Sequence, residues 1–403
     1  MKLVSVNNYH YRRGGAETVF LDHNAMFTDK GHQVAPFSMQ HPSNEETDYE
    51  KYFPSEIEYG SDYSFFKKLR SAASVIYSFE ASESLGHLLA EFSPDILHAH
   101  NIYHHLSTSI LREADVRGVP VVLTLHDLKL ACPAYTMLRD GQVCEDCRHS
   151  RLNVIRHRCI KGSLPLSSII FAEQLIVRLA GLYRKHVSHY VVPSRFYINK
   201  IGEWGIDTKN FSYVPNFVNL PEQSWHNSDD GYYLYMGRLA PEKGLPTLVK
   251  AFIELKIPLM IAGDGPLKAQ VTELAQEHKN INLLGFLGRD EMQAYQRNAR
   301  AVIVPSEWYE NCPMSVIESY GIGKAIIAAD IGGLSEMVAH NDTGLLFEPG
   351  DTDSLISTIQ HFEEIGPQGR ARMGEAARQA CSENYSPDSY YRRIMKIYEQ
   401  VSQ

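Results

Sequence analysis

The chain has 403 residues, of which 44% are hydrophobic and 10% aromatic, and its formal net charge at pH 7 is -9. These values are typical of a globular protein with two or three domains. The sequence contains no uninterrupted run of about 18 apolar residues, which is the length that a membrane-spanning helix needs, so we expect no membrane span. The short apolar stretch at residues 1–8, followed by Arg12 and Arg13, does not have the form of a signal peptide, so we expect a cytoplasmic protein.

The first half of the chain alternates strands and helices, which indicates an α/β domain with a doubly wound parallel sheet. The expected strands are residues 3–6, 34–38, 95–100, 119–125 and 189–192, and the expected helices are 16–30, 107–117 and 166–186. Residues 41–64 are polar and without clear period, so we expect a long loop there. Residues 129–162 form an insertion that carries four cysteines.

The second half repeats this alternation. The expected strands are residues 232–236, 259–262, 281–284, 301–304 and 325–329, and the expected helices are 244–255, 290–297, 314–320 and 388–401. We therefore predict two Rossmann-like domains that face each other across a cleft. Their expected bounds are 1–192 and 229–385, with a crossover at 193–228 and a C-terminal helix at 386–403 that returns to the first domain.

The stretch from 301 to 330 combines a buried strand, a polar loop and a helix that starts at Pro313. In open α/β sheets ligands bind at the carboxyl ends of strands, and a helix N-terminus there offers free backbone N–H groups to an anion. Glu310 in the loop and Glu318 in the helix would repel that anion. They are better suited to accept hydrogen bonds from sugar hydroxyls, although both could be ordinary surface glutamates.

Two further loops follow expected strands and carry residues suited to phosphate. Arg238 and Lys243 could neutralise a diphosphate, Arg as a bidentate fork and Lys as a mobile charge, or could be solvent-exposed cations on a turn. Gly14 and Gly15 would let backbone N–H groups approach a phosphate or a sugar, but a plain tight turn has the same signature.

His126 and Asp127 end the strand at 119–125. A histidine at this place can bond a sugar hydroxyl, and the neighbouring carboxylate can fix the tautomer of its ring. The alternative is a structural histidine at a strand end.

Taken together, these motifs resemble the retaining glycosyltransferases of the family 4, or group 1, type, which have the GT-B fold. The resemblance covers nearly the whole chain. Its most specific motifs are GRLAPEKG, AGDGP and the block ENCPMSVIE followed by GIGKAIIAADIGGLSEMV. The shorter motifs RRGGAE, TLHD, VPSRF and VPNFVN occur in the family's usual order.

The resemblance implies a role for each matching residue. Arg238 and Lys243 would bind the diphosphate of a UDP- or GDP-sugar, Glu310 the hydroxyls of the donor sugar, Glu318 the ribose, and His126 the sugar from the first domain. The positions implied in substrate binding are Gly14, Gly15, Asn216, Gly265, Arg289, Met314, Ser315, Val316 and Glu318. None of the motifs named above contains an Asp-x-Asp metal sequence, so we expect no catalytic metal, and the resemblance implies transfer with retention on the face from which the phosphate leaves.

Four of the six cysteines lie in the insertion, at Cys132, Cys144, Cys147 and Cys159. Disulfides are not expected in a cytosolic protein, so the group is either a structural zinc site or four free thiols. Only Cys144 and Cys147 have the close spacing of metal ligands.

Residues 148–200 contain ten Lys or Arg and one acid, a local charge of +9 on an acidic protein. The helix at 166–186 is apolar nearly all round, and we expect it to be buried rather than in contact with lipid. The cations around it would form a patch suited to an anionic membrane surface, and they are Arg148, Arg151, Arg156, Arg158, Lys161, Arg184 and Lys185. We therefore predict a lipid-linked glycan acceptor and peripheral contact with the inner face of a bacterial membrane.

Two other classes of protein share some of these features. A nucleotide-sugar epimerase could have the fold but would not need GRLAPEKG or the two glutamates at this spacing. A zinc-containing nucleic-acid binder could have the cysteines and the basic zone but would not need the diphosphate motifs, so we expect no nucleic-acid partner.

Overall fold

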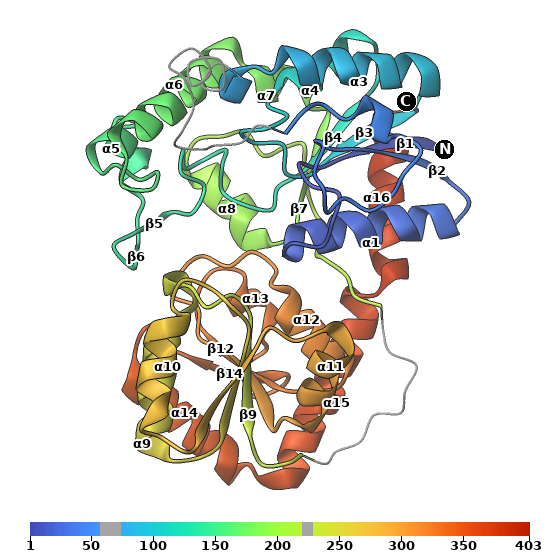
Figure 1. Ribbon diagram of the computed structural model, residues 1–403. Helices are drawn as coiled ribbons and strands as arrows, with labels where there is room; N and C mark the ends of the chain where they lie inside the picture. The colour runs from blue at the N-terminus through green and yellow to red at the C-terminus, as the bar shows by residue number, and fades with distance from the viewer. Residues whose placement is uncertain (57–73, 220–228) are drawn as a thin grey trace.

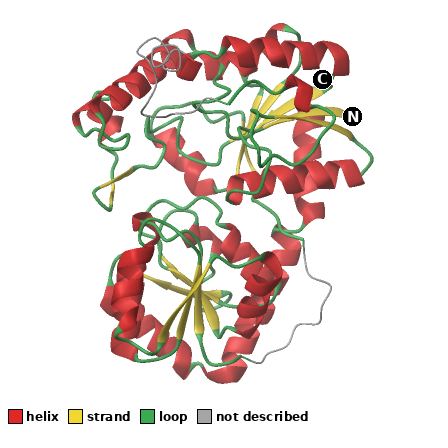
Figure 2. Ribbon diagram, viewed as in Figure 1, coloured by secondary structure: helices red, strands yellow, loops and turns green. Residues whose placement is uncertain are grey.

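The computed structural model of the protein describes residues 1–56, 74–219 and 229–403. Part of the loop expected at 41–64 lies outside these residues. The chain folds into two α/β domains, each built on a six-stranded sheet with helices on both faces (Figures 1 and 2). The predicted pair of Rossmann-like domains is confirmed.

The first sheet is entirely parallel and has the strand order β2-β1-β3-β4-β7-β8. Its strands are β1 (Lys2–Val6), β2 (Gln33–Phe37), β3 (Ile96–Ala99), β4 (Val121–Thr124), β7 (His189–Val192) and β8 (Phe211–Tyr213). The central strands are buried on both faces, which is why they appear in the sequence as short continuous apolar runs. The sixth strand, β8, lies within the segment 193–228 that we expected to be the crossover.

The helices of this domain cover both faces of the sheet. They are α1 (Gly15–Asp29), α3 (Phe79–Phe92), α4 (Ser109–Val116), α5 (Asn153–Arg156), α6 (Leu164–Ala180), α7 (Leu182–His186) and α8 (Arg195–Glu203), with 3-10 turns η1 (Glu50–Tyr52) and η2 (Asp146–Arg148). The cysteine-containing insertion adds a small hairpin of β5 (Leu138–Arg139) and β6 (Gln142–Val143).

The second sheet is also parallel, with the order β11-β10-β9-β12-β13-β14. Its strands are β9 (Tyr233–Met236), β10 (Leu259–Ala262), β11 (Ile281–Gly285), β12 (Ala301–Val304), β13 (Ile326–Ala329) and β14 (Gly344–Phe347). The strand order reverses between β9 and β12. In doubly wound sheets the ligand crevice lies at this reversal, outside the carboxyl ends of the strands.

The second domain has helices on both sides of its sheet, and the last helix leaves it. They are α9 (Leu245–Leu255), α10 (Lys268–Gln276), α11 (Arg289–Asn298), α12 (Met314–Gly321), α13 (Leu334–Met337), α14 (Thr352–Glu364), α15 (Gly366–Asn384) and α16 (Pro387–Val401), with the 3-10 turn η3 (Pro241–Lys243).

The last helix, α16, returns to the first domain as predicted, and Figure 1 shows it beside the strands of the first sheet. Its buried side chains Ile394 and Tyr398 pack in one cluster with Leu3, Ile96 and Val122. The chain therefore crosses between the domains twice, which limits how far they can separate.

The helix expected at 166–186 differs from the prediction in two ways. It is interrupted at Gly181, whose φ of 66° ends α6 and begins α7. The expected burial of this helix was wrong, because α6 lies at the outer side of its domain (Figure 1) and is held there mainly by Ser167, Ile170, Glu173 and Val177. Five of its large apolar side chains are 36% to 78% exposed, namely Leu164, Leu166, Leu175, Ile176 and Leu179.

None of the helices in the described part of the chain combines the length and the hydropathy that a membrane span requires.

Candidate active site

Three loops of the second domain meet at the carboxyl ends of its strands because glycines allow close backbone contact. Gly244, at a φ of 66°, lies so close to the carbonyl oxygen of Pro305 that a Cβ would overlap it. The same holds for Gly265 against the carbonyl of Leu239. Two of the predicted motifs, GRLAPEKG and AGDGP, and the loop after β12 therefore form one continuous surface.

Glu310 is buried at the centre of this surface, with 5% of its area exposed. Its Oε1 accepts hydrogen bonds from Lys243 Nζ at 2.6 Å and from Ser306 Oγ at 2.6 Å. Burial by itself raises the pKa of the Glu310 carboxyl, but the Lys243 ammonium, Ser306 and the side chain of Trp308 together hold that pKa below its usual value. The carboxyl is therefore ionised at neutral pH.

Lys243 has a second contact, with its Nζ 5.2 Å from the centre of the Trp308 ring. Arg238 is exposed, and its backbone carbonyl accepts a hydrogen bond from Tyr235 OH at 2.8 Å. The Arg238 guanidinium is close enough to Tyr135, in the cysteine-containing insertion, to oppose the rise that burial causes in the pKa of that phenol. The two predicted diphosphate ligands thus differ, because Lys243 is engaged by protein groups and Arg238 faces the first domain.

Two helix N-termini meet where the domains face each other. A Cβ at Gly15, the first residue of α1, would lie 3.5 Å from Met314 Cγ, at the first turn of α12. Gly14, the N-cap of α1, is exposed. Of the three amides predicted to bind phosphate, that of Val316 already donates to Pro313 O at 3.1 Å, whereas Met314 and Ser315 precede it in the helix. Both helix ends direct partial positive charge at one place.

Glu318 is half-buried in α12, and burial raises the pKa of its carboxyl. The Arg289 guanidinium opposes this rise, and the Asp22 carboxylate of α1 adds to it. The structure therefore brings together Glu318, which was predicted to contact the ribose, and Arg289, which was predicted to bind substrate. Asp22 comes from the other domain and was not predicted.

His126 follows the end of β4, on the first-domain side, and is half-buried. Burial lowers the pKa of its ring to about 4, so the ring is neutral at pH 7. The partner that the structure provides is not Asp127, as the sequence suggested, but His100, whose Nδ1 lies 2.9 Å from His126 Nε2. Asp127 Oδ1 instead accepts the backbone N–H of Lys129 at 2.8 Å, and burial raises the pKa of Asp127 to about 6.

The loop around Glu310 is held by residues of the first domain on both sides. Asn311 Nδ2 donates to the carbonyl of Leu125, next to His126, at 3.0 Å. On the other side, Tyr309 OH donates to Glu145 Oε1 at 2.9 Å, and Tyr197 OH donates to the carbonyl of Tyr309 at 3.0 Å. These contacts fix the first-domain histidine and the second-domain glutamate relative to each other.

Sequence reasoning missed these contacts. Tyr309 and Asn311 flank Glu310 directly, and that adjacency was the only signal for them. Asn216 was predicted as a site residue, and the structure places it behind the loop, with Nδ2 donating to the carbonyl of Cys312 at 2.9 Å. In this structure Asn216 thus supports the loop from behind.

None of the four insertion cysteines is in a disulfide. Burial raises the pKa of the Cys147 thiol to about 12 and that of Cys159 to about 11, and in both cases the neighbouring thiols add to the rise. The insertion thus brings all four close to one another. Across residues 1–56, 74–219 and 229–403, however, the group with three metal-ligand atoms within 4.8 Å of one another is His23, His98 and His100, and the thiols do not form such a group.

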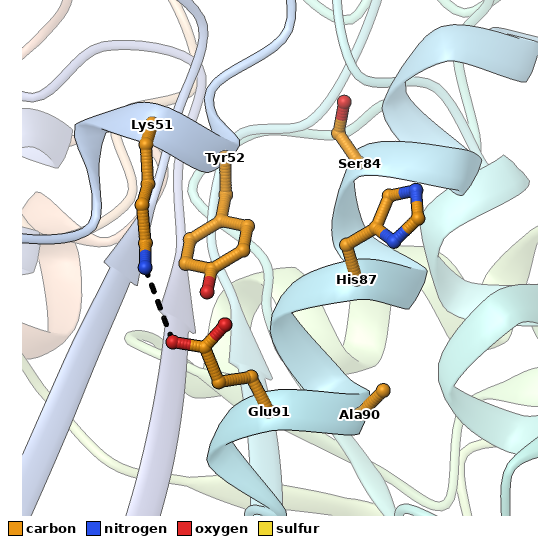
Figure 3. A pocket seen from close by; sticks show the side chains of 6 residues that line it. All are labelled: Lys51, Tyr52, Ser84, His87, Ala90 and Glu91. Atoms are coloured by element: carbon orange, nitrogen blue, oxygen red, sulfur yellow. Dashed lines mark hydrogen bonds and ion pairs between the residues drawn. The ribbon is translucent and has the colours of Figure 1, made fainter.

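A surface hollow of about 620 Å³ lies between η1 and α3 (Figure 3). Its lining residues are Lys51, Tyr52, Ser84, His87, Ala90 and Glu91. An exposed ion pair of 3.1 Å joins Lys51 to Glu91. No residue that we predicted for the site lines this hollow.

Comparison with known proteins gives a family for both halves of the chain. The model of Glycosyltransferase Family 4 matches residues 13–222, and the model of Glycosyl transferases group 1 matches residues 217–380. The chain belongs to the family 4, or group 1, glycosyltransferases. The predicted resemblance is confirmed, and its motifs lie within the two matched regions, apart from Arg12 at the start of RRGGAE.

Solved structures with this architecture cover almost the whole of this glycosyltransferase. Sucrose-phosphate synthase from Thermosynechococcus elongatus matches with a TM-score of 0.71 and 17% identity, over 99% of this chain and 98% of that one. Anabaena HepE in complex with UDP-glucose matches with a TM-score of 0.68 and 17% identity, over 99% and 100%. At this identity the likeness establishes the fold, which is GT-B.

Among curated relatives, the lipopolysaccharide 1,2-N-acetylglucosaminetransferase of Salmonella typhimurium is 29% identical over 232 residues, 51% of this chain and 60% of the relative. An uncharacterised glycosyltransferase of Methanocaldococcus jannaschii is 28% identical over 218 residues, 53% and 59%. The chain therefore matches about three-fifths of the length of these relatives.

Proposed function

We propose that this protein is a retaining glycosyltransferase that moves a sugar from a nucleoside-diphosphate sugar, with UDP or GDP as the nucleotide, to a hydroxyl of a glycan. The observation that carries the proposal is the ionised, buried Glu310 held by Lys243 beside the N-terminus of α12, opposite Gly15 of the first domain. A UDP-glucose complex of the structurally similar HepE supports a nucleotide-sugar donor.

The site is suited to stabilise a diphosphate leaving group with protein charges. Arg238 and Lys243 supply two cations, and the ends of α1 and α12 supply partial positive charge at the same place. These groups can neutralise the departing phosphate in place of a divalent ion. We therefore propose that transfer needs no catalytic metal, and that activity in EDTA equals activity in magnesium.

The environment of Glu310 favours a sugar-positioning role over a nucleophilic one. Its Oε1 is already bonded to Lys243 and Ser306, and its lowered pKa makes it a weak base. In the proposed reaction the bond between the anomeric carbon and the phosphate oxygen breaks, and the acceptor oxygen bonds to the same face. The acceptor proton passes to the departing phosphate, so no covalent enzyme intermediate is needed.

A turnover assay tests this proposal. A panel of UDP- and GDP-sugars is screened for release of the nucleoside diphosphate in the presence of short glycan acceptors, and the anomeric configuration of the product is determined by NMR. Retention of configuration supports the proposal. Inversion, or conversion of a nucleotide sugar to its epimer without an acceptor, would refute it.

The first domain supports a membrane-linked acceptor through two kinds of exposed side chain. The apolar face of α6, defined by Leu164, Leu166, Leu175, Ile176 and Leu179, is open. Exposed cations flank it, namely Arg148, Arg156, Arg158, Lys161, Arg178, Arg184 and Lys185. Arg151 was predicted to belong to this patch, but it is half-buried, donates to the carbonyl of Ala131 and lies over the Trp204 ring.

We propose that this face of α5 to α7 rests on an anionic membrane surface at the cytoplasmic side, with about 1 kcal/mol contributed by each nearby cation. The lipopolysaccharide N-acetylglucosaminetransferase among the relatives is consistent with a glycan of the cell surface as acceptor, and we propose a lipid-linked one.

Sedimentation with vesicles tests the membrane contact. Anionic vesicles should bind the wild type more strongly than neutral ones. Arg156→Ser with Arg158→Ser and Lys161→Ser should weaken that preference, and Leu175→Ser with Leu179→Ser should weaken binding to both. Lys250→Ser with Lys279→Ser, which removes two exposed cations of the second domain, is the control for a loss of positive charge elsewhere. Binding that ignores anionic lipid would favour a soluble acceptor.

We also propose that one structural zinc ion is bound by Cys132, Cys144, Cys147 and Cys159, whose sulfurs move to within bonding distance of the ion. Burial raises the pKa of the Cys132 thiol, but the backbone N–H groups of Met137 and Ala134 oppose that rise by bonding the thiolate, which is the form that zinc binds. Elemental analysis of the purified protein decides this, with one equivalent expected. Less than about a tenth of an equivalent would establish free thiols.

A further inference from the structure

His126 and His100 share one hydrogen bond, and the position of its proton decides what His126 can do. The distance between His100 Nδ1 and His126 Nε2 is 2.9 Å, and the two rings meet edge to edge, with their centres 5.2 Å apart and their planes at 20°. Only one of the two nitrogens carries the proton, because burial lowers the pKa of both rings and keeps both neutral.

The surroundings of His100 indicate which ring donates. His100 is completely buried, and its Nε2 has no hydrogen-bond partner within the described part of the chain. If His126 were the donor, neutral His100 would carry its own proton on Nε2 as a buried N–H without an acceptor. If His100 donates, only an unshared electron pair is left there. Buried N–H groups without partners are rarer in proteins than unpaired acceptors, so the second arrangement is favoured.

The neighbouring ring keeps His100 in this position. His98 stacks on His100, with the ring centres 4.7 Å apart and the planes at 21°. Both nitrogens of His98 are bonded, Nδ1 to Tyr398 OH at 2.6 Å and Nε2 to Thr124 Oγ1 at 2.7 Å. Tyr398 belongs to α16, so the returning helix bonds one end of a row of three imidazoles whose other end is His126.

We propose that His100 is a positioning residue that donates its Nδ1–H to His126 Nε2 and so fixes His126 as the Nδ1–H tautomer. His126 then presents an N–H donor, not a lone pair, to a hydroxyl or other oxygen of the ligand between the domains. The assignment of the tautomer stands on the geometry of the free protein. Its effect on transfer rests on the proposed function, in which His126 contacts the donor sugar.

The tautomer is measured first, in the wild-type protein without ligand. Two-dimensional NMR of protein labelled with ¹⁵N in histidine distinguishes Nδ1–H from Nε2–H rings, and a His126→Asn sample assigns the His126 signals. We expect the Nδ1–H form for both His126 and His100 at pH 7.5. An Nε2–H form of His126 would overturn the proposal, whatever the enzyme's activity.

Turnover then tests the consequence with a pair of variants. The side-chain amide of asparagine lies near the position of a histidine Nδ1, so His100→Asn keeps the donor. His100→Gln places its amide farther along the side chain and loses it. We expect His100→Gln to lower kcat by roughly tenfold to a hundredfold with little change in KM for the donor, and His100→Asn to restore most of it.

The control is His189→Asn, which removes another buried histidine of the same sheet, bonded through Nε2 to Ser212 Oγ at 2.9 Å. Its kcat should match that of the wild type. Equal losses in His100→Asn and His100→Gln would mean that His100 acts only by filling space, and would overturn the positioning role. If the variants fail to fold, the wild-type NMR measurement still decides the tautomer.

Discussion

Lys243 Nζ lies 2.6 Å from Glu310 Oε1, so the residue predicted to bind the donor diphosphate is paired with the residue predicted to hold the donor sugar. The pair joins the loop after β9 to the loop after β12, at the reversal of strand order. A diphosphate that binds here must share the Lys243 ammonium with a buried carboxylate. Binding of the donor and orientation of its sugar are therefore coupled through one ion pair.

Glu310→Gln should nearly abolish transfer and leave nucleotide affinity close to the wild-type value. The amide keeps a partner for Ser306 but loses the charge-assisted bonds to sugar hydroxyls, at a cost of roughly 2 to 4 kcal/mol of barrier. Steady-state kinetics measures the loss of transfer, and nucleotide titration of the same preparation measures the affinity. Turnover equal to that of the wild type would remove Glu310 from the mechanism.

Arg238→Ala and Lys243→Ala should both weaken binding of a nucleoside diphosphate but differ in stability. Arg238 is exposed, so its removal should change the free energy of unfolding by less than about 0.5 kcal/mol. Removal of Lys243 leaves the buried Glu310 carboxylate unpaired, which should cost about 3 kcal/mol. Denaturant unfolding of the two variants measures the contrast, and equal stabilities would contradict it.

The same pair predicts a change in pH dependence. In the wild type the pKa of Glu310 is lowered, so its contribution to stability is present above the unfolded pKa and is lost as pH falls through the folded pKa. In Lys243→Ala burial is no longer opposed by the ammonium, so the pKa of Glu310 should rise. The free energy of unfolding of Lys243→Ala should therefore fall further below that of the wild type as pH increases. If the two proteins have the same pH profile, Lys243 does not set the pKa of Glu310.

Asp127→Asn should stabilise the protein at alkaline pH. The folded pKa of Asp127 is raised to about 6 by burial, so the stability that the protonated carboxyl contributes is lost as pH rises through that value. Asparagine keeps the oxygen that accepts from Lys129 N and does not ionise. The gain over wild type should be near zero at pH 4 and about 2 kcal/mol at pH 8, measured by denaturant unfolding. A gain that is independent of pH would indicate that ionisation of Asp127 is not its source.

Tyr309→Phe should slow transfer severalfold without changing donor affinity, because it removes the bond from the Glu310 loop to Glu145 of the first domain. Burial raises the pKa of Tyr309 to about 12, and Glu145 adds to the rise, so the phenol is a donor at every working pH. Tyr391→Phe, which loses a similar bond of 2.8 Å to His32 far from this loop, is the control. Equal kcat in the two variants would contradict the role of Tyr309.

Much of the fold was predictable because buried parallel strands have a simple signature. The strands at Leu259–Ala262, Ala301–Val304 and His189–Val192 have the bounds expected from their apolar runs. The exposure of the apolar side chains of α6 was not predictable in this way. An apolar helix shows by its pattern that it avoids water, but not whether a neighbouring element covers each side.

The candidate site was predictable where residues close in sequence share a loop. Glu310 and Lys243 were found from their motifs, although the bond between them was not. His100 was missed as the partner of His126 because their contact requires β3 and β4 to be neighbours in the sheet. The order of strands and helices along the sequence does not determine which strands are neighbours. Asn311 and Leu125 lie 186 residues apart, and only the packing of the two domains brings them together.

Calorimetric titration with UDP and with GDP in EDTA tests the central claim most directly. The account predicts that one of them binds the wild type at one site per chain, that the same nucleotide binds Arg238→Ala at least about tenfold more weakly, and that Glu310→Gln binds it nearly as well as the wild type. Binding that requires a divalent ion, or binding of neither nucleotide while an oligonucleotide binds, would contradict a nucleotide-sugar site built from Arg238, Lys243 and the helix N-termini.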